Sequence, residues 1–149
     1  MKPLIVLITV FIISFFVIYF FFPDLNYRLA GCIAMSVMLL FTGIAHFKYT
    51  KGMVLMMPDF MPIKEVWVYF TGIVEIAAAV GLLIPSLKIT TSWLLILFFV
   101  LILPANIYSA IQHVNYEKGN NEGKGSSYLW FRIPLQLLFI GWVYYFGIR

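Results

Sequence analysis

Glu75 is an ionisable residue in the middle of an otherwise apolar segment, Val66–Pro85. A charged side chain at the centre of a membrane-spanning helix costs roughly 2.5–3.5 kcal/mol, so such residues usually face a partner or a cavity and mark functional sites. A carboxyl group in that position can take up a proton, pair with a cation or accept hydrogen bonds from a ligand. Glu75 is therefore the first residue whose chemistry points to a function.

Other polar residues are expected at a similar depth in the neighbouring apolar segments. At a rise of about 1.5 Å per residue, they fall in the same half of the bilayer as Glu75. Imidazole, guanidinium and amide groups can donate hydrogen bonds to an apolar molecule that carries carbonyl oxygens. The candidate ligand-binding residues are His46, Glu75, Asn106, Arg132 and Gln136. The sequence assigns no catalytic residue and no metal site, and it leaves the charge state of Glu75 open.

Side-chain direction favours one shared cavity. Side chains in a helix lean toward its N-terminus, so Glu75 is expected to lean toward Arg132. Asn106 lies on a helix that runs the opposite way and should lean toward Glu75. Asn106, Ser109 and His113 are spaced to share one face of that helix. These positions predict a polar cavity in the inner leaflet.

Each candidate also has a purely structural interpretation. Glu75 and Arg132 could form an ion pair that only holds the helices together. Arg132 could instead extend to the lipid headgroups. Asn106 and Gln136 could make hydrogen bonds between helices, which contribute around 1 kcal/mol. His46 could be an interfacial residue at a helix end. The convergence of all five favours a functional pocket.

The composition is that of a membrane protein. Of the 149 residues, 63% are hydrophobic and 11% are charged, whereas soluble domains have about 45–50% and 25%. The length suits one domain. The formal charge of +4 comes from scattered basic residues, so no nucleic-acid partner is expected. Cys32 is the single cysteine, which excludes an internal disulfide, a CxxC pair and a thiolate zinc site.

Five apolar stretches are each long enough to cross a bilayer. Because lipid cannot solvate free amide groups, these stretches should be helices, which makes the fold an all-α membrane protein. The predicted spans are Leu4–Phe22, Leu29–Phe47, Val66–Pro85, Ser92–Gln112 and Leu129–Gly147.

The basic residues predict the orientation, because cytoplasmic loops carry an excess of Lys and Arg. One side holds Lys2, Lys48, Lys51, Lys64, Lys118, Lys124 and Arg132. The other side holds Arg28, Lys88 and Arg149. This bias favours a cytoplasmic N-terminus and an external C-terminus.

Two features of the spans suit a pocket. Gly72, Ala78 and Ala79 lie on the Glu75 side of their helix, where small residues let a neighbouring helix approach closely. Pro104 lies inside the fourth span and removes the hydrogen bond to the carbonyl of Val100, which should bend the helix beside Asn106.

The connector Lys48–Glu65 carries Met53, Met56, Met57 and Met61 around Phe60. Methionine forms an adaptable surface for apolar ligands, so this segment could be a lid. The alternative is an interfacial loop that covers the helix ends.

Several motifs occur together in order. They are AHF at 45–47, MPDFMP at 57–62, YFTGIVEIAAAVGLLIP at 69–85, PANIYSA at 104–110 and LWFRIPLQ at 129–136. On these motifs the chain resembles the DoxX family of small bacterial membrane proteins, from about Leu29 to Tyr145. All five candidate residues lie inside them.

The resemblance implies a four-helix bundle over 29–149, preceded by an extra N-terminal helix and turn over 1–28. It also implies a multi-pass protein of the bacterial cytoplasmic membrane with a link to redox chemistry, since relatives include a subunit of thiosulfate:quinone oxidoreductase. No catalytic residues are carried over from the family.

Two functions follow as hypotheses. The first is a redox-associated membrane protein whose inner-leaflet pocket binds a quinone or another small apolar ligand. The chain has no haem, flavin or iron–sulfur motif, so electrons would come through a ligand or a membrane redox partner. A homo-oligomer is a further possible assembly. The alternative is a non-enzymatic assembly factor or accessory subunit of a membrane complex. Whether the protein is an enzyme stays open; if it is, it would be an oxidoreductase-associated subunit.

Overall fold

The computed structural model describes residues 2–21, 26–58, 60–115, 117–123, 125 and 129–149. Across these residues the chain is helical and has no strand, apart from an isolated β-bridge between Asn115 and Asn120. The predicted all-α fold is therefore confirmed. The elements are α1 (Lys2–Phe21), α2 (Tyr27–Lys48), α3 (Thr50–Val54), α4 (Lys64–Gly81), α5 (Lys88–Ile111), α6 (Leu129–Val143) and a short π-helical end, η2 (Tyr144–Ile148).

Four helices are long and apolar enough to cross a membrane: α1, α2, α5, and α6 with its continuation η2. The predicted span Val66–Pro85 corresponds to α4, which has 18 residues, among them Lys64, Glu65 and Glu75. Three charges in so short a helix weaken its apolar character. The fifth crossing therefore stays a prediction.

The helix bounds differ from the predicted ones by a few residues. Asn26 is the N-cap of α2. Its side-chain oxygen accepts a hydrogen bond from the backbone amide of Leu29 (3.1 Å), which fixes the start of the helix at Tyr27. The helix α4 ends at Gly81, and α5 begins at Lys88, earlier than predicted. Phe22 and the turn residues 23–25 lie outside the described residues.

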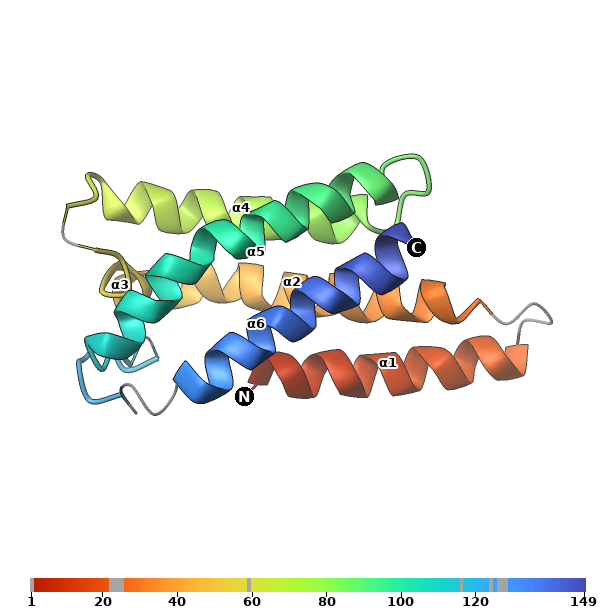
Figure 1. Ribbon diagram of the computed structural model, residues 1–149, viewed down its shortest axis with the longest axis horizontal. Coiled ribbons are helices and arrows are strands. Elements are labelled where there is room, and N and C mark those ends of the chain that lie inside the picture. Colours follow the sequence, from red (N-terminus) through yellow and green to blue (C-terminus); the bar gives the residue numbers. More distant parts are fainter. Residues whose placement is uncertain (1, 22–25, 59, 116, 124, 126–128) are drawn as a thin grey trace.

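The helices form two layers (Figure 1). One layer holds α1, α2 and α4 side by side, and α5 and α6 cross it diagonally as an antiparallel pair. Apolar side chains fill the space between the layers. The buried core residues are Leu7, Ala34, Met35, Met38, Leu39, Ala79, Leu82, Leu95, Phe99, Phe139 and Val143.

The first helix is an integral part of this core. Leu7 of α1 is fully buried. The ring of Phe11 lies 5.0 Å from the ring of Trp142 and 5.4 Å from that of Phe146. The helix α1 therefore packs on α2 and on the C-terminal helix at once.

The two groups of basic residues lie at opposite ends of the bundle (Figure 1). At one end, Lys2 Nζ forms an ion pair with Glu117 Oε1 (2.8 Å). At the other end, Arg28 Nη1 donates to the C-terminal carbonyl of Arg149 (2.6 Å). The up-and-down path of the helices produces this separation. Lys124 lies outside the described residues.

Replacing Lys2 with glutamine is expected to leave the thermal unfolding midpoint in detergent unchanged within error. Both partners of the ion pair are exposed to solvent, so screening and lost side-chain entropy offset the attraction. The midpoint should be measured at low and at high salt. A clear drop that disappears at high salt would contradict this expectation.

Candidate functional site

The site depends on a close contact between α2 and α4. A Cβ atom added to Gly72 would lie 2.8 Å from Cβ of His46 and 3.2 Å from the carbonyl oxygen of Gly43. One added to Gly43 would lie 3.1 Å from the carbonyl oxygen of Gly72. The close approach predicted at Gly72 is present, and its partner is α2. Because His46 and Glu75 each follow one of these glycines by three residues, the contact sets them side by side.

Glu75 is buried, with 6% of its surface exposed. Its Oε2 lies 3.7 Å from Nδ1 of His46, and it has no hydrogen-bond partner among the described residues. His46 Nδ1 lies 2.9 Å from the carbonyl oxygen of Thr42. A carbonyl can only accept, so Nδ1 carries a hydrogen, and Nε2 of the neutral ring is an acceptor. The Nδ1 hydrogen is directed to Thr42, so Oε2 is left without a donor.

The amides and the guanidinium form a second group, between α5 and α6. Asn106 Nδ2 donates to Gln136 Oε1 (3.1 Å), and Gln136 Nε2 donates to the carbonyl of Phe99 (2.6 Å). Arg132 Nη1 donates to Ser109 Oγ (3.3 Å). Gln136 itself is buried. Asn106 and Gln136 therefore make hydrogen bonds between α5 and α6, as their structural interpretation predicts.

The ion pair between Glu75 and Arg132 is absent from the described part of the chain, so that structural alternative is wrong. Glu75 lies instead beside His46, with 3.7 Å between Oε2 and Nδ1, because the glycine contact joins α4 to α2. Arg132 bonds to α5 through Ser109 and the carbonyl of Asn106. The packing of the helices decides which side chains meet. The direction of a side chain along its own helix does not determine that packing.

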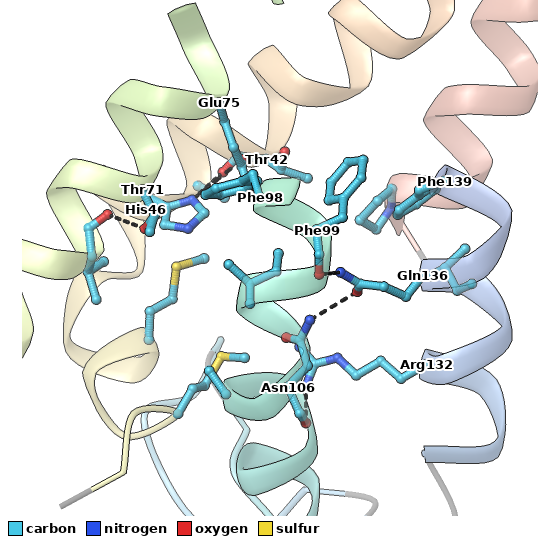
Figure 2. Close-up of a pocket in the computed structure, with 18 of the residues that line it drawn as sticks. Thr42, His46, Thr71, Glu75, Phe98, Phe99, Asn106, Arg132, Gln136 and Phe139 are labelled. Carbon is cyan, nitrogen blue, oxygen red and sulfur yellow. Dashed lines mark hydrogen bonds and ion pairs between the residues drawn. The ribbon is translucent and has the colours of Figure 1, made fainter. Parts of the chain in front are cut away.

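The two groups face one cavity of about 240 Å³ (Figure 2). Pro3 also lines it, so the cavity lies near the end of the bundle that holds the N-terminus. All five candidate residues line it. The remaining wall is mainly apolar and aromatic. Its other residues are Pro3, Met38, Phe41, Thr42, Ala45, Met53, Met56, Met57, Val68, Thr71, Phe98, Phe99, Ile102, Ala105, Leu135 and Phe139.

The connector contributes to the cavity only in part. Met53, Met56 and Met57 line it, whereas Phe60 is 84% exposed and points away. Lys64 Nζ donates to the carbonyl of Met57 (3.2 Å), which holds the connector on α4. Met61 does not line the cavity. Asp59, within the MPDFMP motif, lies outside the described residues.

Sequence reasoning missed the aromatic wall and misplaced one polar residue. Phe41, Phe98 and Phe99 line the cavity, but in a run of apolar residues nothing separates a phenylalanine that faces a cavity from one that faces lipid. His113 was expected on the face of Asn106. It lies beyond the end of α5 with a left-handed backbone (φ 55°) and is exposed, because the helix ends at Ile111.

The arrangement can hold a small molecule by hydrogen bonds at two places and by apolar contacts between them. No cluster of three His, Cys, Asp or Glu side chains suited to a metal ion occurs in the described residues. The helices and the cavity define a class, the α-helical membrane proteins with a mainly apolar pocket that contains a few polar side chains.

Residues 35–147 match the family described as Domain of unknown function (DUF8561), and the chain belongs to that family. The matched region runs from α2 to η2 and includes every candidate site residue. No curated protein and no solved structure matches the chain.

Proposed function

We propose that this protein is a DoxX-like, redox-associated protein of the bacterial cytoplasmic membrane, and that its cavity binds a quinone-like or other small apolar ligand. One observation carries the proposal: a buried carboxyl oxygen, Glu75 Oε2, lacks a hydrogen-bond partner among the described residues and borders a cavity. A buried polar atom without a partner costs about 1–3 kcal/mol. A ligand that bonds to it would recover that cost.

The cavity size supports a ring-shaped ligand. An apolar cavity of about 150 Å³ can hold benzene, and this one measures about 240 Å³. Its phenylalanines and methionines provide flat and polarisable surfaces for a ring.

The membrane topology of the proposal has five spans. The charged residues Lys64 and Glu65 lie in the first turn of α4, where they can reach the headgroups, so Glu75 is the one charge left within the span. The helix α4 packs along α2, itself long and apolar enough to span. The cavity lies at the end of the bundle with more basic residues, which supports a cytoplasmic position for it and for the N-terminus.

The alternative, an accessory subunit that binds a partner helix, has less support. Its proposed contact surfaces were the first helix and the small-residue face of α4, and on that face of α4 Gly72 and Ala79 are buried within the chain. Gly72 lies directly against His46 and Gly43 of α2. That face is therefore already occupied.

Protein extracted in a mild detergent or in lipid nanodiscs is expected to retain a small ring-bearing molecule, detected by native mass spectrometry. Glu75→Gln should lower its occupancy, because the loss of the carboxyl oxygen leaves a buried polar group of the ligand without its bond, which costs about 1–3 kcal/mol, at least about a five-fold change in affinity. The matched control is Glu65→Gln on the same helix, since Glu65 is exposed and does not line the cavity.

Phospholipid alone in the parent protein and in both variants would contradict the proposal. Capture of one defined protein partner, with no small molecule in the parent, would favour the accessory subunit instead.

A further inference from the structure

We infer that the cavity selects an uncharged aromatic molecule of one or two rings that carries a hydroxyl group, and that this hydroxyl binds Glu75 Oε2. The inference rests on the proposed function, because it names the ligand class of the same cavity. It goes further, since it assigns a hydroxyl rather than a carbonyl to the position beside Glu75.

The threonine hydroxyls near Glu75 leave its Oε2 atom without a hydrogen bond. Thr42 Oγ1 donates to the carbonyls of Met38 and Leu39, each at 3.2 Å. Thr71 Oγ1 lies 3.0 Å from the carbonyls of Trp67 and Val68 on its own helix. Both threonines line the cavity, yet their hydrogens bond within their own helices. Among the described residues no donor reaches Oε2, so a ligand or a water molecule can supply one.

A hydroxyl suits Oε2 in either protonation state of Glu75. It can donate to a carboxylate oxygen, and it can also accept from a protonated carboxyl, because a hydroxyl is both donor and acceptor. A ligand carbonyl can only accept, so it bonds Oε2 only when that atom carries the proton. A ligand hydroxyl can therefore hydrogen-bond to Oε2 whether Glu75 is protonated or not.

The charges around the cavity favour a neutral ligand. An anion would lie beside the Glu75 carboxyl in a site of low polarity. A cation would share the cavity with the guanidinium group of Arg132. An uncharged hydroxyl meets neither repulsion.

The apolar wall sets the shape of the ligand. Phe98 and Phe99 on α5 and Phe139 on α6 line the cavity together with the methionines of the connector. Aromatic rings pack favourably against phenylalanine and against the methionine sulfur. With about 240 Å³ available, against about 150 Å³ for a site that holds benzene, two fused rings with a small substituent are of suitable size.

The test compares probes that differ at one position. These are 2-naphthol, 2-methylnaphthalene, 1,4-naphthoquinone and the cation of 2-naphthylmethylamine, each titrated into the protein in nanodiscs with empty nanodiscs as the blank. We expect 2-naphthol to bind about ten- to a hundred-fold more tightly than 2-methylnaphthalene, the range for a hydrogen bond to a carboxyl group. In Glu75→Leu the two should bind alike, whereas Glu65→Leu should keep the preference.

The outcomes separate the two proposals. Equal binding of all four probes by the parent protein overturns the hydroxyl preference and leaves a ligand-binding cavity. Tighter binding of the quinone or of the cation overturns the inference in the same way. Failure of every probe, with no molecule retained on purification, overturns the proposed function as well. If Glu75→Leu does not fold, the probe series on the parent protein decides alone.

Discussion

Replacing Gly72 with leucine is expected to lower the free energy of unfolding by about 1–3 kcal/mol and to separate His46 from Glu75. Even a single added Cβ would lie 2.8 Å from Cβ of His46 and 3.2 Å from a backbone carbonyl oxygen of α2, so the two helices must move apart. Forcing extra carbons into a packed contact typically costs that much. The backbone on the other side of the contact cannot rotate away as a flexible side chain would.

The measurement is unfolding in mixed micelles by titration with a denaturing detergent. Gly141→Leu is the matched control, because an added Cβ at Gly141 meets nothing within 4 Å, and leucine is the better helix former. Retention of a bound ring compound should fall in Gly72→Leu and persist in Gly141→Leu. Equal stability of the two variants would mean that α2 and α4 do not approach at Gly72 in the membrane.

Replacing Gln136 with leucine is expected to destabilise the protein by about 1–3 kcal/mol, although leucine is more apolar. Gln136 makes two hydrogen bonds between α6 and α5, one from Asn106 Nδ2 and one to the carbonyl of Phe99. Hydrogen bonds between membrane helices contribute on average about 0.6 kcal/mol and at most about 1.7 kcal/mol each. The half-buried amide of Asn106 would also lose its partner.

The same unfolding titration tests this variant against Gln112→Leu. Gln112 lies just beyond α5, is exposed and does not line the cavity. The double variant Asn106→Leu with Gln136→Leu should be less destabilised than the sum of the two single changes, because it removes both members of one bond. Additive losses would show that the two amides act independently.

The sequence alone predicts the helices and the depth of the polar residues. Runs of about 20 apolar residues must be helical in lipid, where each backbone group needs a partner nearby in the chain. The rise per residue then gives the depth of each side chain within its helix. For this reason His46, Glu75, Asn106, Arg132 and Gln136 were identifiable before any contact was known, and all of them line one cavity.

The partners of these residues depend on how the helices rotate and pack against one another. The nearest of the candidate residues to Glu75 is His46 rather than Arg132, because Gly43 and Gly72 bring α2 and α4 together. The same packing turns Phe98 and Phe99 into the cavity while Leu97 stays exposed. In lipid, apolar side chains on either face of a helix have similar surroundings, so only the fit between helices decides which of them line the site.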